Sequence, residues 1–399
     1  MQQPPTMDDS SRPHDAPHIL NSKLVSKALY DYGKLYKSES SYNTSSPTSI
    51  DDLRALVSAA QTDNRRIRVR GSGHTFNGCT LPAREELLVR THQLNWYRCD
   101  ESGTITVGAG VLVWDIRDFV RDFGYELPVH NGGWAGPTLG GYICAGGFGK
   151  GSLSDQHGGL WENVLSITLV DGTATEHVIE RTDPRFAWLF GSYGQLGIIV
   201  EAKLKILPTH PAAGLLYPKN RSGLVTCRQS DDPSLNDNAP ATDSKVLFWF
   251  SLLLDPSQEA SAWQHLFNFC LRYTGILQPN GGWAGPLLGD NPIGYRYNIR
   301  YKEFNPPLVY NNQGDFIVLG VMSFFNYSAY SSQPTILDIE RDFVKLATDN
   351  NFRLYLQAEN IGRNVNYEEY YGSEVFSQFR SLKECLDPEY LINPGIVFS

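Results

Sequence analysis

The sequence predicts an α+β protein built from two parts, and three observations lead to this fold class. A helical pattern over 52–62 runs into a strand over 66–70 and then into a glycine-rich turn. A second stretch, 132–197, holds many paired glycines between short strands and helices. After Pro208 the composition becomes polar and turn-rich, and strands then alternate with helices again.

The chain is long enough for one very large domain or two ordinary ones. It has 399 residues, of which 41% are hydrophobic and 19% charged, a composition that suits substantial cores rather than disorder. With 34 basic and 43 acidic side chains the net charge is −9, and no long basic run is present, so nucleic-acid binding is not expected. The six cysteines are scattered without a C-x-x-C pair, which argues against a zinc site or a redox dithiol.

The N-terminal residues show no recognisable targeting signal. Residues 1–17 are polar and proline-rich and lack the apolar core of a signal peptide. No window approaches the roughly 18 consecutive apolar residues of a membrane-spanning helix. We therefore expect a cytoplasmic protein without a membrane span, in which residues 1–45 form a polar leader and a helix over 19–36.

The elements of the first part follow from apolar periodicity and from turn residues. Thr48 or Ser49 suits the cap of the helix over 52–62, whose first turn is acidic. Further strands are expected at 87–90, 104–110, 164–172 and 194–206, and short helices at 114–123 and 183–190. After Pro208, strands are expected at 246–254, 317–322 and 352–356, and helices at 262–273 and 336–349.

The strand over 66–70 ends in the most informative turn of the chain. Residues 68–78 read Arg-Val-Arg-Gly-Ser-Gly-His-Thr-Phe-Asn-Gly. Glycines after a strand let backbone N–H groups approach an anion without side-chain obstruction. Phe76 stands where the dinucleotide fingerprint G-x-G-x-x-G has its third glycine, and no Gly-Lys-Ser/Thr of a P-loop follows. Taken alone, the stretch could also be a tight surface turn with an exposed histidine.

The turn resembles the pyrophosphate loop of FAD-linked oxidoreductases of the vanillyl-alcohol oxidase (PCMH-type) superfamily. The usual form of that loop is Arg-(Ser/Gly)-(Gly/Ser)-Gly-His-(Ser/Thr), and in many members its histidine, here His74, carries the flavin covalently through the 8α-methyl group. Five further motifs of the family follow in order, at 107–114, 137–141, 149–152, 163–172 and 194–199. The stretch 367–395 resembles the tail of berberine-bridge-like members, in which the chain returns to the flavin.

This resemblance implies a two-domain PCMH-type fold with an inserted α+β substrate domain. The FAD-binding domain would cover 46–208, the substrate domain 209–358, and residues 359–399 would return to the FAD-binding domain. FAD is the implied cofactor, and no metal is implied. The residues that match the family's cofactor-binding motifs are Arg70, Gly71, Ser72, Gly73, His74, Thr75, Asn77, Pro137, Thr138, Gly140, Gly141, Gly146, Gly149, Ser152, Gly197, Ile199 and Asn393.

The implied function is that of an oxidase or dehydrogenase acting on a small organic substrate. A hydride would pass from an alcohol, a sugar, a lactone or a secondary metabolite to flavin N5, with molecular oxygen as one candidate electron acceptor. Two alternatives stay open. One is a redox-neutral flavoprotein of secondary metabolism, such as a cyclase or isomerase, and the other is a binding protein that has kept the fold.

The catalytic base is less clearly marked than the cofactor site. Berberine-bridge-like members often carry Tyr-x-Asn-Tyr, whereas residues 364–367 read Asn-Val-Asn-Tyr. Asn366 and Tyr367 are therefore the catalytic candidates, with aromatic packing as the alternative role of Tyr367. Bicovalent members place a cysteine at the glycine-rich element, but Gly136 precedes Pro137 here, so one covalent bond is expected. The residues expected to line the substrate cleft are Arg300, Tyr301, Asn360 and Tyr367.

Overall fold

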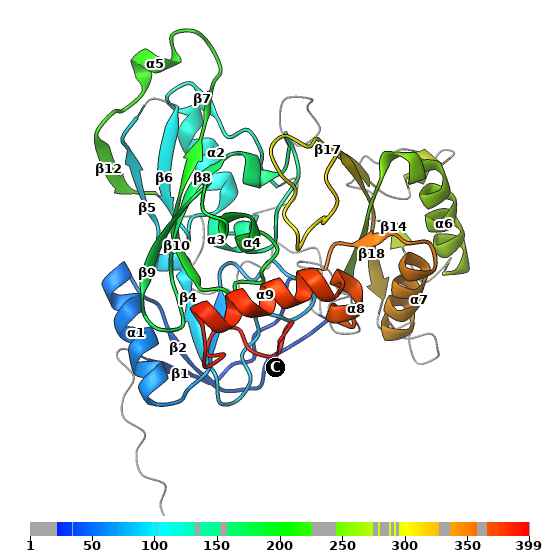
Figure 1. Ribbon diagram of the computed structural model, residues 1–399, viewed down its shortest axis with the longest axis horizontal. Helices are drawn as coiled ribbons and strands as arrows, with labels where there is room; N and C mark the ends of the chain where they lie inside the picture. Colours follow the sequence, from blue (N-terminus) through cyan, green and yellow to red (C-terminus); the bar gives the residue numbers. More distant parts are fainter. Residues whose placement is uncertain are drawn as a thin grey trace, which may run out of the picture.

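The computed structural model describes the greater part of the chain. The described residues are 22–33, 35–101, 103–131, 136–151, 158–225, 245–273, 278–279, 287–288, 291–292, 295–326, 336–356 and 365–398. They form a first part up to residue 225, a second part over 245–356, and a tail over 365–398 (Figure 1).

A four-stranded sheet opens the first part. Its order is β1-β2-β4-β3, and β2, β4 and β3 run parallel. The bounds are Lys23–Val25 for β1, Tyr42–Ser45 for β2, Ile67–Arg70 for β3 and Leu87–Arg90 for β4. Helix α1 (Ile50–Thr62) packs against this sheet through its buried apolar face. Its N-terminus is capped by Ser49, whose hydroxyl accepts a hydrogen bond from the N–H of Asp52 at 3.1 Å.

A six-stranded antiparallel sheet makes up the rest of the first part. Its order is β12-β5-β6-β10-β8-β9. The bounds are Trp96–Cys99 (β5), Thr104–Gly108 (β6), Val164–Val170 (β8), Glu176–Glu180 (β9), Ile198–Lys205 (β10) and Arg221–Leu224 (β12). The other elements are α2 (Val113–Arg121), α3 (Leu139–Cys144), α4 (Phe186–Leu189), α5 (Ala213–Leu216), η1 (Thr91–Gln93), η2 (Leu160–Glu162) and the pair β7 (Tyr125–Glu126) and β11 (Leu207–Pro208).

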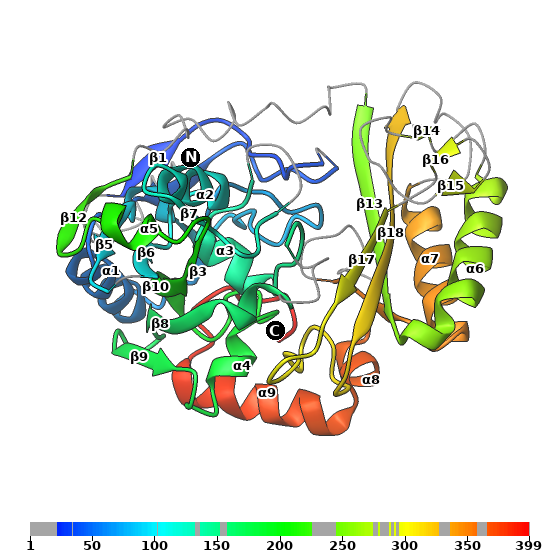
Figure 2. The ribbon, with the colours of Figure 1, turned by 90° about the horizontal axis from the view of Figure 1, so that it is seen from above.

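The second part is a sheet covered by helices on one face. Strands β14 (Gln278–Pro279), β18 (Phe316–Asn326), β13 (Lys245–Leu254) and β19 (Arg353–Leu354) pair in this order, and β17 (Tyr295–Ile299) also pairs with β18. Helices α6 (Glu259–Arg272) and α7 (Ile336–Asp349) lie on the face that points away from the first part (Figure 2). The remaining elements are η4 (Pro256–Gln258), β15 (Leu287–Leu288) and β16 (Asn291–Pro292).

The tail crosses from the second part back to the first. Helix α8 (Tyr367–Tyr371) is followed by α9 (Ser373–Leu386), which runs along the first part next to α4 (Figure 2). The chain then returns to β3, where Ile67 and Ile392 form a parallel bridge.

The N-terminal region differs from the sequence expectation. No helix occurs over 19–36 within the described residues, which hold β1 and a bridge between Tyr30 and Lys37. Leu29 buries against neighbouring strands instead, in a cluster with Tyr42 and Leu88. Pairing with β2 therefore overrides the helical spacing.

Two boundaries also differ. The sequence predicts that the second part starts at residue 209, whereas β12 pairs with β5 inside the six-stranded sheet. The polar composition marks an exposed edge strand, because all four residues of β12 are exposed. The strand expected over 194–206 begins only at Ile198, since Gly194 and Gly197 have positive φ angles and form a turn before it.

Candidate functional site

The turn after β3 packs against the turn that precedes α3. A Cβ atom on Gly71 would lie 2.2 Å from Oγ1 of Thr138, and one on Gly73 would lie 2.1 Å from Nη2 of Arg70. Gly73 also has a φ angle of +71°, which suits glycine. Two of the glycine motifs identified in the sequence are therefore in contact.

A buried cation lies beneath this turn. Arg70 is 3% exposed, and its guanidinium donates to Oγ1 of Thr80 at 2.9 Å and to the carbonyl of Tyr30 at 2.8 Å. Its Nε atom has no hydrogen-bond partner among the described residues, and burial lowers its pKa to about 10. Within the described part of the chain, the backbone N–H groups of 71–73 also donate to no acceptor. Unused donors beside a buried cation suit an anion.

Aromatic rings continue from the turn toward the second part. The ring of His74 stacks on Tyr32 with centroids 4.0 Å apart. Tyr32 contacts Phe76 at 5.3 Å, and Phe76 contacts Trp249 of β13 at 5.4 Å. The sequence does not point to Tyr32 as a site residue, because it lies in the segment 19–36, for which a helix is expected.

Neighbouring loop residues hold the turn to the chain around it. The side chain of Asn77 donates to the carbonyl of Leu356 at 3.1 Å and accepts from the N–H of Cys79. The carbonyl of Thr75 accepts a hydrogen bond from the N–H of Tyr32 at 2.8 Å. Ser72, the other cofactor-binding candidate in this turn, is partly exposed.

Helix α3 starts beside the glycine turn. Thr138 is 1% exposed and caps the helix, its Oγ1 accepting from the N–H of Gly141 at 3.3 Å. Gly140 lies against Ala109, where a Cβ atom would approach to 3.0 Å. Pro137 is partly exposed, and its carbonyl accepts from the N–H of Val113 at 3.0 Å.

Tyr142, on α3, lies where the first part meets the second. It is 5% exposed, and its hydroxyl has no partner among the described residues. Burial, with added effects of Tyr355 and Tyr297, raises its pKa well above 10. The phenol therefore stays protonated and holds an unused hydrogen-bond donor in a buried place.

Four further rings also lie at this junction. Phe148 contacts Tyr355 at 4.6 Å and Tyr297 at 6.0 Å, and Trp249 contacts Tyr355 at 6.5 Å. We call Tyr142, Phe148, Trp249, Tyr297 and Tyr355 the aromatic wall. The sequence gives no signal for these residues as a group, because they come from five separate places in the chain and share no spacing.

Three further glycines are required by packing of the chain itself. A Cβ atom on Gly146 would lie 2.2 Å from Val309, one on Gly149 would lie 2.4 Å from the carbonyl of His130, and one on Gly197 would lie 2.7 Å from Leu169. Ile199 is buried in β10, and Ser152 lies outside the described residues. The cofactor-binding roles of these five positions stay predictions.

The two catalytic candidates differ in their surroundings. Asn366 is exposed and caps α8, its side chain accepting from the N–H of Glu369 at 3.4 Å. Tyr367 is buried with its ring 6.3 Å from that of Tyr193, and burial raises its pKa to about 12. A phenol with a raised pKa donates hydrogen bonds and is a weak general base near neutral pH. The geometry favours the packing role of Tyr367.

The side chains of the expected cleft residues in the second part interact with nearby residues of the same part. Arg300 pairs with Asp315 at 2.5 Å, and the hydroxyl of Tyr301 donates to the carbonyl of Glu303 at 3.0 Å. Asn360 lies outside the described residues. The arginine and the tyrosine therefore serve contacts within the second part.

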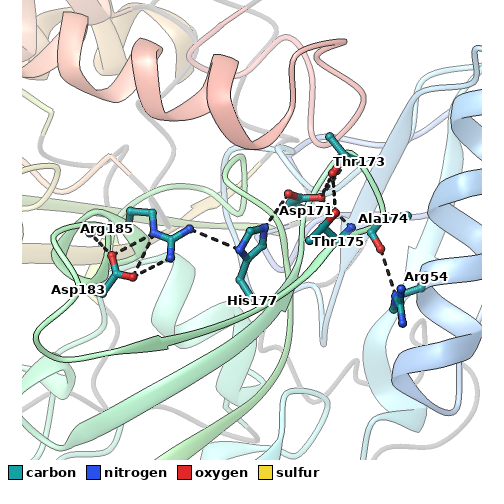
Figure 3. Close-up of polar contacts among 8 residues, drawn as sticks. All are labelled: Arg54, Asp171, Thr173, Ala174, Thr175, His177, Asp183 and Arg185. Carbon is teal, nitrogen blue, oxygen red and sulfur yellow. Dashed lines mark hydrogen bonds and ion pairs between the residues drawn. The ribbon is translucent and has the colours of Figure 1, made fainter.

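A separate polar cluster lies on the β8–β9 hairpin (Figure 3). His177 contacts Asp171 at 2.7 Å and Arg185 at 3.4 Å, and Arg185 pairs with Asp183. These contacts fasten the hairpin to the start of α4. Across the described ranges, no group of three or more His, Cys, Asp or Glu could hold a metal ion. Nor does that portion contain a helix long and apolar enough to cross a membrane.

Comparison with known proteins identifies the first part. Residues 44–180 match the FAD binding domain family. Residues 44–180 of this chain form an FAD-binding domain. The expected cofactor is confirmed by this match, and the PCMH-type superfamily is confirmed with it.

The similar proteins include two lactone oxidases. The chain is 31% identical over 170 residues to D-arabinono-1,4-lactone oxidase of Eremothecium gossypii, covering 41% of this chain and 31% of that protein. It is 26% identical over 242 residues to L-gulonolactone oxidase of Scyliorhinus torazame, covering 57% and 52%. The chain thus spans about a third to a half of the length of these relatives.

The solved structures confirm the fold class. The crystal structure of Phl p 4, described as a grass pollen allergen with glucose dehydrogenase activity, superposes with a TM-score of 0.62 at 15% identity. The match covers 89% of this chain and 90% of that one. At this identity it supports the two-domain α+β fold alone.

The residues of the site fit FAD. A diphosphate is an anion, and the FAD-binding domain offers it the buried guanidinium of Arg70 and the unused N–H groups of 71–73. Gly71 and Gly73 keep this place clear of Cβ atoms. The buried hydroxyl of Tyr142 adds a donor near the second part.

Proposed function

We propose that this protein is an FAD-dependent oxidoreductase that removes a hydride from a hydroxyl-bearing carbon of a sugar or a sugar-derived lactone. One observation carries the proposal: a glycine turn over the buried Arg70 lies in ring contact with the uncharged aromatic wall. Bound FAD supplies the chemistry, because its N5 atom accepts two electrons as a hydride. The chain supplies anion binding, orientation and exclusion of water.

The aromatic wall supports a neutral ring as the substrate. The phenols of Tyr142 and Tyr297 stay uncharged near neutral pH, since burial raises the pKa of Tyr297 to about 12 and that of Tyr142 well above 10. Aromatic rings contact the C–H faces of a sugar or lactone, and phenol hydroxyls bond to its oxygens. A charged substrate buried there would need an opposite charge. The names of the lactone-oxidase relatives agree with this class of substrate.

The test is anaerobic reduction. The purified protein is mixed without oxygen with L-gulono-1,4-lactone, D-arabinono-1,4-lactone or D-glucose, and its visible absorption is followed. The proposal expects at least one of them to bleach the flavin, and Trp249→Ala to slow bleaching about tenfold or more through lost ring contact. Absence of bleaching by every sugar and lactone tried, with dithionite bleaching intact, would contradict it.

We further propose that His74 carries the flavin through one covalent bond. The support is its place at the end of the glycine turn, where its ring is fixed against Tyr32. Acid precipitation tests this: flavin should stay in the pellet of the native protein and leave that of His74→Ala. Flavin released from the native protein would end the covalent proposal and leave the binding site in place.

The electron acceptor is a separate question. We propose molecular oxygen as one candidate, and readmission of air to the bleached protein tests it. Rapid return of the visible band indicates an oxidase, and slow return indicates a dehydrogenase. The cytoplasmic location and the berberine-bridge-like character of the tail stay predictions.

A further inference from the structure

The tail extends the sheet that carries the glycine turn. The N–H of Ile67 donates to the carbonyl of Leu391 at 2.8 Å, and the N–H of Asn393 donates back to the carbonyl of Ile67 at 2.8 Å. These bonds lie on β3, a few residues before the turn at Gly71. We call Lys383, Asp387 and Asn393 the tail clasp.

A buried ion pair organises the clasp. Lys383 and Asp387 are both 0% exposed and lie 2.5 Å apart. The ammonium of Lys383 also donates to the carbonyls of Gln195 at 2.7 Å and Ile392 at 2.8 Å. The carboxylate of Asp387 accepts the N–H groups of Leu391 and Ile392. Because both charged groups also form these hydrogen bonds to the backbone, the ion pair favours one arrangement of the tail.

Asn393 connects two segments of the first part. Its side-chain oxygen accepts from the N–H of Val69 at 2.8 Å. Its side-chain nitrogen donates to the carbonyls of Tyr193 at 3.0 Å and Gly194 at 3.1 Å. Gln195 returns a bond to the carbonyl of Asn393 at 3.1 Å. One side chain therefore joins β3 to the turn over 193–197.

That turn reaches α3 as well. The N–H of Tyr193 donates to the carbonyl of Cys144, the last residue of α3, at 3.1 Å. At its other end α3 is capped by Thr138, which packs against Gly71. The clasp thus closes a loop of contacts that runs from β3 through the 193–197 turn to α3 and back to the glycine turn.

We propose that the tail clasp is a positioning device for the flavin site. By fixing the glycine turn relative to α3, it sets the affinity for FAD through these two elements. This inference rests on the proposed flavin site. Coupling of this kind is reciprocal, so bound FAD should protect the docked tail as much as the docked tail favours FAD.

The lead variant is Asn393→Gly. Glycine accepts the φ angle of +48° that Asn393 has, so the change removes side-chain bonds without backbone strain. Asn64→Gly is the matched control, because Asn64 has the same φ angle of +48°, lies in the FAD-binding domain and is exposed. Both changes are made in a His74→Ala background, which makes flavin binding an equilibrium whether or not the native bond is covalent.

Two measurements follow. FAD affinity is measured by flavin fluorescence, and hydrogen exchange of Ile67, Val69 and Ile392 amides is measured with and without FAD. We expect Asn393→Gly to weaken FAD binding about tenfold or more, Asn64→Gly to stay within about twofold, and FAD to slow exchange in the background protein. If Asn393→Gly does not fold, Gln195→Met removes one bond of the same set and should weaken FAD binding by a smaller factor.

The results that would overturn the positioning role differ from the result that would overturn the flavin site. If Asn393→Gly speeds exchange but keeps control affinity for FAD, the clasp is a structural lock alone and the proposal is overturned. The proposal is also overturned if Asn393→Gly does not fold and Gln195→Met keeps control affinity. A background protein that folds but binds no FAD would overturn the flavin site itself, and the positioning role with it.

Discussion

At the scale of single residues, we predict that flavin binding depends on the two glycines of the turn after β3. Gly73 and Gly395 share a φ angle of +71°, yet a Cβ atom would meet Arg70 at the first and nothing within 4 Å at the second. Alanine at either position should cost about 1 kcal/mol of backbone strain. Only Gly73→Ala should also displace the guanidinium of Arg70 and lower flavin content several-fold. Denaturant unfolding and the flavin-to-protein ratio of both variants check this.

His130 gives a residue-scale prediction for pH dependence. Burial lowers the pKa of His130 below its ordinary 6.5; the charges of Arg117 and Lys150 lower it too, while the Asn131 carbonyl and Asp118 oppose the shift. A cation with a depressed folded-state pKa binds fewer protons when folded. The contribution of neutral His130 to the unfolding free energy is therefore fully present above pH 6.5. It is lost as the pH falls toward and below the folded-state pKa of His130. When the unfolding free energy is measured from pH 8 to 5, it should fall less steeply in the His130→Gln variant than in the native protein.

At the scale of elements, α1 offers a test of the first sheet and its helix. Ser49→Ala removes the cap at the N–H of Asp52 and should lower the unfolding free energy by about 1 kcal/mol. Ser58→Ala, an exposed site within the same helix, should leave stability unchanged or raise it slightly. Equal losses from the two substitutions would show that the cap is not formed.

The same element shows how far sequence reasoning reaches. Apolar spacing and Ser49 predict α1, and the β-branched run before Gly71 predicts β3, because both signals are local. The N-terminal residues mislead, since strand pairing with β2 outweighs their helical spacing. The glycine motifs at 71–73 and 138–141 are predicted from resemblance, and the structure shows that they lie in contact. The aromatic wall and Lys383 could not be predicted, because each depends on residues that only the folded chain brings together.

At the scale of the whole molecule, Arg181 links the first part to the second. Its guanidinium donates to the carbonyls of Trp161 and Val164, pairs with Glu303 at 2.5 Å and lies over the ring of Phe304. Arg181→Met should therefore uncouple the two parts, so that calorimetric unfolding broadens or splits into two transitions. Arg121→Met, at an exposed ion pair of α2, is the control and should keep the native transition shape. An unchanged transition in Arg181→Met would contradict the link.

The central claim is that the glycine turn over Arg70 holds FAD, and the visible spectrum of the purified protein tests it most directly. We predict a yellow protein with close to one flavin per chain, and a Gly71→Val variant that folds but contains little flavin, because its side chain would collide with Thr138. A native protein that folds, stays colourless and takes up no added FAD would contradict this claim.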